Sequence, residues 1–240
     1  MKKSDLSRRN LLFRAMALGA VSPLAACDYK DPQHPDLADK FLNLMSSWND
    51  RVQEALFNPR TLAPTFSVTQ ITRPPRFNAF YDISQVQVVD LETYKLELSG
   101  QIQDRNPWTI AALRNLPQSS QITRLVCIEG WRVIGQWGGV PLGGFLRRIG
   151  ADTRCKYVSF QCADGYYTSI DMPSALHPQT ILALDFLGEP LTPPFGAPIR
   201  VRIPTKLGFK NPKSIISMNV GNVYTGGYWE DQGYNWFSGS

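Results

Sequence analysis

The sequence predicts an α+β protein, a single domain in which β-strands dominate and helices are few. Its composition favours a folded chain, because 43% of the 240 residues are hydrophobic and 11% are aromatic, while only 19% are charged. The length is typical of one domain. From residue 85 onward, short apolar or alternating segments separated by Gly and Pro turns indicate strands. Only one long segment, near the N-terminus, has the apolar periodicity of a surface helix.

Residues 1–26 carry most of the net charge. Five of the 25 Lys and Arg residues and one of the 20 Asp and Glu residues lie there, so the formal charge of +5 falls to +1 for the remainder. A near-neutral remainder argues against a nucleic-acid partner. The apolar run 15–26 is shorter than the roughly 20 residues of a membrane span, as in a bacterial signal peptide. The preceding Arg8-Arg9 pair resembles the twin-arginine export signal, although a chance Arg pair before a core helix is the alternative.

Twin-arginine export machinery moves proteins that are already folded, many of them around a cofactor, so we expect export and a cofactor. Residues 24–27 read Leu-Ala-Ala-Cys and resemble a lipobox, in which Cys27 becomes the acylated first residue. Asp28 resembles a signal for retention at the inner membrane. We therefore expect a periplasmic protein with a lipid anchor to the inner membrane. Ordinary cleavage nearby, with Cys27 a bystander, is the alternative.

Residues 27–36 are expected to form a tether, and residues 37–76 an N-terminal helix and linker. Asp36 is a suitable helix cap, and Asn58-Pro59 a helix stop. The apolar residues between them are spaced by threes and fours, which predicts an amphipathic helix packed on the domain or on a partner. Membrane-surface binding is disfavoured because the polar face carries both signs of charge. The apolar stripe consists of Leu37, Phe41, Leu44, Met45, Trp48, Val52, Ala55 and Leu56.

The remaining chain, residues 77–240, is expected to be the main domain. Short helices are predicted at 109–115 and 142–149. Strands are predicted at 86–89, 94–99, 121–128, 156–162, 166–171, 180–187, 198–204 and 214–220.

The sequence lacks the residues that several common kinds of active site require. The chain has two histidines, His34 and His177, and no C-x-x-C pair, which disfavours a zinc or two-histidine iron site. No G-x-S-x-G elbow, G-x-G-x-x-G fingerprint or Walker loop is present, so the usual hydrolase and nucleotide signatures are missing.

The cysteines of the main domain are more informative. Cys155 and Cys162 bracket one predicted strand and would lie about 23 Å apart, too far for a disulfide. Cys127 ends a predicted strand with Arg124 and Arg132 nearby, where a thiolate is stabilised or binds a soft metal. A buried core cysteine is the alternative.

Longer motifs surround Cys127. Residues 124–131 read RLVCIEGW, followed by Trp137 and Pro141-Leu142. Further blocks are FNAFY at 77–81, ALHP at 175–178, GEPL at 188–191, GAPIR at 196–200 and LGFKNPKSI at 207–215. In order and spacing these resemble the sulfite-oxidase superfamily of molybdopterin enzymes, especially its periplasmic methionine-sulfoxide reductases. The resemblance covers residues 77–220 and implies a sulfite-oxidase-type molybdopterin-binding fold.

The resemblance also implies a site. Cys127 matches the cysteine that binds molybdenum, and soft sulfur suits a metal that cycles between oxidation levels. The positions that match cofactor contacts are Asn78, Tyr81, Cys162, Arg200, Gly208, Phe209, Lys210 and Lys213. The positions from Arg200 onward match residues that bind the pterin phosphate, and a phosphate is well bound by cationic side chains and backbone N–H donors. A surface strand residue at 200 and a solvated loop for the lysines are the alternatives.

Some positions depart from the family pattern and leave the substrate open. Cys162 replaces a threonine, and Phe195 an asparagine, that the sulfoxide reductases place near the cofactor. Arg132 has a counterpart in sulfite oxidases, where arginines receive the anion, and is counted as a candidate catalytic residue beside Cys127. Glu129 and Trp131 match the sulfoxide reductases instead.

We therefore expect an exported molybdenum–molybdopterin oxidoreductase that transfers an oxygen atom in two-electron steps on sulfite or a sulfoxide. No C-x-x-C-H haem motif exists, so a separate membrane or periplasmic cytochrome is expected to exchange electrons. The alternative is a lipoprotein that uses the same fold for binding or assembly without turnover. The tail aromatics are expected to cover the site mouth, line a dimer surface or form a packed flap. They are Tyr224, Tyr228, Trp229, Tyr234 and Trp236.

Overall fold

The computed structural model describes residues 35–79 and 81–239. The predicted signal peptide, the lipobox cysteine Cys27 and the tether up to residue 34 lie outside them. The chain divides into two compact units, residues 1–45 and 46–240. Within the described ranges, no helix combines the length and apolar character needed to cross a membrane.

Helix α2, Pro35–Leu56, is the predicted amphipathic helix, and it ends just before Asn58 and Pro59. Within the second unit, Trp48 and Leu56 on this helix are 59% and 79% exposed. These two members of the apolar stripe therefore do not pack into the core of that unit.

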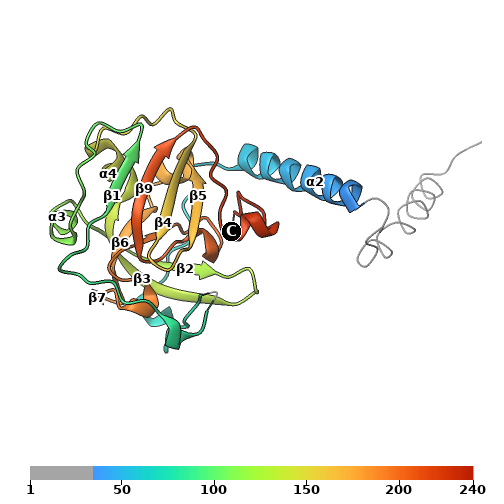
Figure 1. The fold of residues 1–240 in the computed structure, drawn as a ribbon. Helices are drawn as coiled ribbons and strands as arrows, with labels where there is room; N and C mark the ends of the chain where they lie inside the picture. Colours follow the sequence, from blue (N-terminus) through green and yellow to red (C-terminus); the bar gives the residue numbers. More distant parts are fainter. Residues whose placement is uncertain (1–34, 80, 240) are drawn as a thin grey trace, which may run out of the picture. The chain divides into compact units, whose positions relative to one another are not determined.

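The second unit contains two β-sheets (Figure 1). The first has the strand order β1-β9-β4-β5, with β1 at Glu97–Gly100 and β9 at Ile215–Gly221. Strand β4 is Tyr157–Cys162 and β5 is Tyr167–Asp171. Strands β1 and β9 run parallel, whereas the other pairs are antiparallel. The C-terminal part of the chain thus supplies a strand between β1 and β4.

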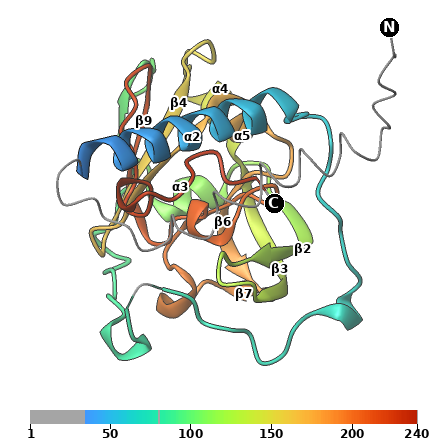
Figure 2. The same ribbon diagram turned by 90° about the vertical axis from the view of Figure 1, so that its right-hand side faces the viewer.

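The second sheet has the order β2-β3-β6-β7, grouped together in Figure 2. Its strands are β2 at Ser119–Val126, β3 at Arg132–Pro141, β6 at Ile181–Phe186 and β7 at Glu189–Pro190. Strand β8, Arg200–Arg202, pairs with β6 as well. Strands β2 and β3 form a hairpin whose turn holds residues 127–131.

Short helices connect the strands. They are α3 at Ile110–Arg114, α4 at Leu142–Arg148 and α5 at Met172–Leu176, with 3-10 turns at Val68–Gln70, Ile83–Gln85, Pro193–Phe195, Gly208–Lys210 and Glu230–Gln232. Asp171 caps α5 by accepting the Ser174 N–H at 2.9 Å.

Two hydrophobic clusters form the core. The larger packs the first sheet against α4 and the β8 region, through residues that include Leu98, Phe145, Val158, Phe160, Ile199 and Met218. The smaller lies on the second sheet and includes Leu125, Val133, Trp137, Ile181 and Phe186. The predicted single, strand-rich α+β domain is confirmed. The strand predicted at 86–89 is wrong, because this segment has no strand partner and Val88 is 78% exposed.

Candidate active site

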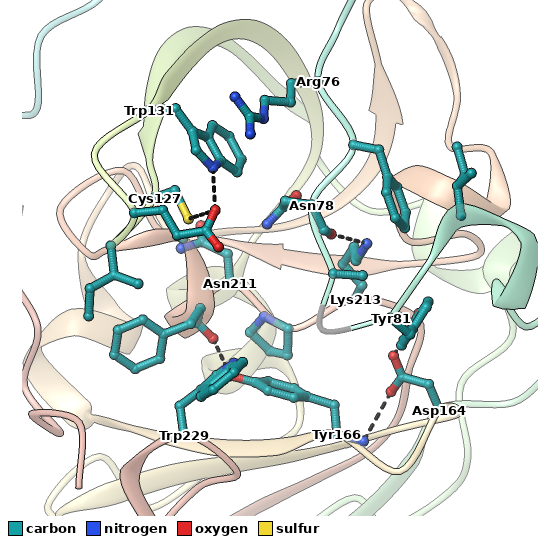
Figure 3. A pocket seen from close by; sticks show the side chains of 18 of the residues that line it. Arg76, Asn78, Tyr81, Cys127, Trp131, Asp164, Tyr166, Asn211, Lys213 and Trp229 are labelled. Carbon is teal, nitrogen blue, oxygen red and sulfur yellow. Dashed lines mark hydrogen bonds between the residues drawn. The ribbon is translucent and has the colours of Figure 1, made fainter. Parts of the chain in front are cut away.

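A cavity of about 460 Å³ opens beside the β2–β3 turn (Figure 3). Five segments of the chain line it. They are residues 76–83, 127–131, 164–166, 208–213 and the tail residues Trp229 and Tyr234, although not every residue in each range reaches the cavity. Residues far apart in the sequence thus meet around the Cys127 thiol.

The turn after β2 places Cys127 at the cavity wall. The Cys127 N–H donates to Trp131 O at 2.9 Å, and the Gly130 N–H donates to Cys127 O at 3.1 Å. Gly130 has a φ of +87°, a conformation that favours glycine. Cys127 is half-buried, and burial is the main cause that raises the pKa of its thiol. A metal that binds this sulfur must therefore displace its proton.

A carboxylate lies next to this thiol. The Trp131 Nε1–H donates to Glu129 Oε2 at 2.7 Å, and the Cys127 Sγ lies 3.8 Å from the same oxygen. The Arg76 guanidinium stacks over the Trp131 ring, 4.5 Å from its centre. The indole therefore holds the Glu129 carboxylate in place from one side while Arg76 covers its ring.

The opposite part of the cavity holds Asn78, Tyr81 and Lys213. Lys213 Nζ donates to Asn78 O at 2.6 Å and to Pro194 O at 3.0 Å. Burial first, and then the Arg200 charge, lower the pKa of Lys213 to about 7. The Tyr81 hydroxyl donates to Asp164 Oδ2 at 2.9 Å, and burial raises the pKa of Tyr81.

The 3-10 turn at Gly208–Lys210 forms another wall. A Cβ on Gly208 would lie 3.2 Å from Leu125 Cδ2 and 3.3 Å from Val126 O, so this turn packs closely on the end of β2. Phe209 and Asn211 line the cavity beside it. The Tyr166 hydroxyl donates to Phe209 O at 2.6 Å, which ties this wall to the loop after β4.

Two of the predicted contacts lie behind the cavity wall instead of on it. Arg200 is 1% exposed and donates to Asn211 O at 3.2 Å and to Phe195 O at 3.0 Å. Burial lowers the pKa of Arg200 to about 10. Cys162 is also buried, and burial raises the pKa of its thiol. The described cysteines Cys127, Cys155 and Cys162 are free, so the prediction that Cys155 and Cys162 do not form a disulfide is confirmed.

Two other predicted residues do not reach the cavity. Arg132 is exposed and follows the turn on β3, where the side chain of the next residue, Val133, is buried. Lys210 is buried, and its Nζ pairs with the Glu230 carboxylate and donates to Ser169 O at 2.6 Å. The placement of these two cations thus corrects the expectation that they face a cofactor phosphate or a substrate oxyanion in the cavity.

Arg202 supports the cavity wall from behind, through Asn211, and was not predicted from the sequence. It is fully buried, and its Nη1 donates to Asn211 Oδ1 at 2.8 Å while Nη2 donates to Arg124 O at 2.7 Å. The spacing could have predicted it, because Arg200 and Arg202 are two residues apart on one strand and their side chains therefore lie on the same face. Arg76, Asp164 and Tyr166 carried no comparable signal.

The residues present fit a molybdopterin cofactor. Cys127 offers one soft sulfur ligand, and Lys213, which lines the same cavity, offers a cation. Arg200 and Arg202 contact no carboxylate within residues 35–79 and 81–239, and the Nε of each is buried without a hydrogen-bond partner. Positive charge therefore remains uncompensated behind the wall, which suits an anionic group.

Comparisons with known proteins also point to a molybdopterin enzyme. Residues 83–229 match the model of the oxidoreductase molybdopterin binding domain. A protein from Azospira oryzae, the putative protein-methionine-sulfoxide reductase subunit YedZ1, is 51% identical over 234 residues, 98% of this chain and 88% of that protein. The protein-methionine-sulfoxide reductase catalytic subunit MsrP of Xanthomonas campestris is 30% identical over 188 residues. That match covers 68% of this chain but 58% of MsrP.

A solved structure shares the fold. The sulfane dehydrogenase SoxCD from Paracoccus pantotrophus aligns with a TM-score of 0.55 at 18% sequence identity, over 58% of this chain and 41% of that one. At this level of identity the alignment supports the fold alone, which is the sulfite-oxidase-type fold that the sequence motifs imply.

Proposed function

This chain belongs to the oxidoreductase molybdopterin-binding domain family, and on that premise we propose that it reduces sulfoxides, with methionine sulfoxide as the substrate class. As a member of the family, it is an oxidoreductase whose cofactor is molybdenum held by molybdopterin. Cys127 is the proposed metal ligand, and Asn78, Tyr81 and Lys213 are the proposed pterin contacts.

The observation that carries this proposal is the composition of the cavity around Cys127. Its apolar part is largely aromatic, and sulfur packs favourably against aromatic rings. The charged group next to the Cys127 sulfur is the Glu129 carboxylate, while the Arg76 guanidinium stacks on the Trp131 ring. Such a lining suits a neutral sulfoxide better than the sulfite anion. Arg132, the residue expected to receive sulfite, lies outside the cavity.

The reaction needs electrons and protons from outside the substrate. Reduction of a sulfoxide consumes two electrons and two protons and releases a sulfide and water. When bound, the molybdenum cofactor supplies the two-electron oxygen-atom transfer. The Glu129 carboxylate, 3.8 Å from the Cys127 sulfur and open to solvent, is placed to carry a proton to the substrate oxygen. Trp131 keeps that carboxylate in position.

A separate carrier is proposed to deliver the electrons, as a membrane or periplasmic cytochrome. The names of the relatives support this proposal, because YedZ1 and MsrP are each called a subunit. Export in the folded state and a lipid anchor at Cys27, on the periplasmic face of the inner membrane, are also proposed. They rest on the leader sequence, and radiolabelled palmitate should be incorporated into wild type and not into Cys27→Ser.

Holoenzyme produced with its own leader provides the test. We expect about one molybdenum per chain, and reduction of methionine sulfoxide with an artificial electron donor. Cys127→Ala should abolish the activity and the part of the metal centre's absorption that depends on the bond from the cysteine sulfur to molybdenum. Glu129→Gln should keep the metal and lower kcat about 100-fold or more.

Arg132→Ala is the matched control, because it removes a charge near Cys127 in the sequence but outside the cavity. It should leave sulfoxide reduction unchanged. Faster turnover of sulfite than of sulfoxides, lost in Arg132→Ala, would refute the proposed substrate. Protein without molybdenum or turnover would instead support the binding-module alternative.

A further inference from the structure

The C-terminal tail contributes an aromatic wall to the cavity. Trp229 and Tyr234 both line it, and in Figure 3 Trp229 lies across the drawn pocket from Trp131. The Trp229 ring packs edge-on against Tyr234 and Tyr228, with ring centres 5.2 Å apart in both pairs. The Tyr234 ring in turn contacts Phe209, 6.1 Å between centres. The tail wall and the Phe209 wall are therefore neighbours.

A buried ion pair joins these two walls. Glu230 follows Trp229 directly, and Lys210 follows Phe209 directly. The Lys210 ammonium pairs with the Glu230 carboxylate, and both side chains are 1% exposed. The Thr168 hydroxyl donates to the same carboxylate oxygen at 2.8 Å. One buried contact thus sets the separation of two cavity-lining residues from different parts of the chain.

The backbone of the tail is shaped around this carboxylate. A Cβ on Gly227 would lie 2.1 Å from Glu230 Oε2, so only glycine leaves room for the side chain there. Gly226, with a φ of +65°, is held by the Ser169 hydroxyl, which donates to its carbonyl at 2.9 Å. The Tyr228 N–H donates to Tyr167 O at 2.9 Å. The turn before Trp229 is therefore anchored to β5 on its way to the cavity.

Stability alone does not account for a buried pair of this kind. Removing two charges from water is costly, and apolar residues of similar size often stabilise a fold as well or better. A charged pair does, however, specify a single geometry, because alternative packings leave an unpaired charge in the core. That property matters most where the position of a neighbouring side chain affects binding.

We propose that Trp229 contacts the apolar carbons of the sulfoxide substrate and that the Lys210–Glu230 pair is the positioning device that holds it against the cavity. This inference rests on the proposed sulfoxide reductase function. It assigns Lys210 to the substrate-side wall and not to the pterin phosphate.

The described part of the chain offers a matched control. Lys206 and Asp171 form a second buried ion pair, with Nζ and Oδ1 3.2 Å apart and side chains 1% and 4% exposed. Neither residue, nor either chain neighbour of Lys206 or Asp171, lines the cavity. Lys206 also donates to Phe237 O at 2.8 Å, beyond the cavity-lining residues of the tail, so neutralising this pair should destabilise the fold without shifting Trp229.

The test compares two neutralised holoenzymes, Lys210→Met/Glu230→Gln and Lys206→Met/Asp171→Asn. For the first, KM for methionine sulfoxide should rise about tenfold, as for loss of an apolar contact in a binding site, with kcat within about twofold. Trp229→Ala should raise KM similarly. Molybdenum content should stay at the wild-type level in all of these variants. The Lys206–Asp171 variant should lower the melting temperature and leave KM unchanged.

A second measurement does not depend on activity. The fluorescence of Trp229 is obtained by subtracting, for each parent protein, the spectrum of the same protein with Trp229→Phe. Acrylamide should quench this fluorescence more strongly in Lys210→Met/Glu230→Gln than in wild type, and equally in the control and wild type. Failure of wild type to reduce sulfoxides, with this change present, would overturn the proposed function and leave the positioning role supported. An equal rise in KM for both pairs would overturn the positioning role. Loss of molybdenum in the Lys210 variant would overturn it as well.

Discussion

Replacing Lys213 with methionine should change how the stability of the apoprotein depends on pH. The wild-type ammonium is largely buried beside the Arg200 charge, and its pKa falls from 10.5 to about 7. In the unfolded chain the lysine keeps its ordinary pKa. Between these two values the unfolded state binds one more proton than the folded state, so the wild-type protein loses stability as the pH falls.

The magnitude follows from this proton difference. Linkage gives a slope of about 1.4 kcal/mol per pH unit for one proton. Integrated from about pH 9.5 to about pH 7.5, the free energy of unfolding of the wild type should fall by about 2.5 kcal/mol relative to Lys213→Met, because the slope is slightly smaller near each pKa. Below the folded pKa both states are protonated, and the difference should become constant. Because the quantity is a slope, the two hydrogen bonds that the variant loses do not affect it.

Urea unfolding of apoprotein from molybdate-free cultures, at several pH values in this window, measures the slope. Lys156→Met, which removes an exposed lysine, is the control for the change in net charge. Parallel curves for wild type and Lys213→Met would refute the argument that this ammonium is forced to lose its proton on folding. In the holoenzyme we expect Lys213→Met to be the less stable protein, because it should release the cofactor more readily than the wild type.

Three further predictions concern other parts of the molecule. Gly139→Ala should lower the free energy of unfolding by about 3 kcal/mol, because its Cβ would lie 2.0 Å from Leu182 O; urea unfolding checks this, and an unchanged midpoint would contradict it. Asp171→Asn should cost about 3–5 kcal/mol, because the Lys206 ammonium would remain buried without its partner; thermal unfolding with and without Lys206→Met separates the pair from its parts. Iodoacetamide should alkylate Cys127 in the apoprotein more slowly than a small free thiol at the same pH, because burial raises its pKa; mass spectrometry of the labelled peptide follows the rate, and equal rates would argue against that burial.

Strands with one buried face were predictable from alternating apolar residues, whereas β6, buried at almost every position, appeared as a short apolar run. Strands β4 and β9 lie within two residues of the predicted segments 156–162 and 214–220, and both alternate buried and less buried residues. Strand β3 was not predicted. Its glycines lower strand propensity, yet they are required there, since a Cβ on Gly135 would lie 2.5 Å from the Phe186 ring. Long-range packing thus overrides the local preference.

The same limit applies to the site. Cys127, Asn78 and Lys213 could be placed at one cavity from the family motifs. The orientation of Lys210 could not, because its partner Glu230 lies 20 residues further along the chain and no local pattern links them. Arg132 differs again, since the hairpin register turns its side chain outward, and that register depends on how long the turn at 127–131 is.

The buried cations show how charge is organised for an anionic cofactor. Lys206 and Lys210 each pair with a carboxylate, and none of these four side chains lines the cavity. Arg200 and Arg202 pair with no carboxylate among the described residues, and both hold Asn211 on the cavity wall. Uncompensated positive charge is therefore concentrated behind that wall, although residues 27–240 have a net charge of only +1. In the residues that the structure describes, carboxylates neutralise Lys206 and Lys210 but not Arg200 and Arg202. A dianionic phosphate that enters the cavity would therefore be attracted by these two arginines, an effect that the net charge of the chain does not reveal.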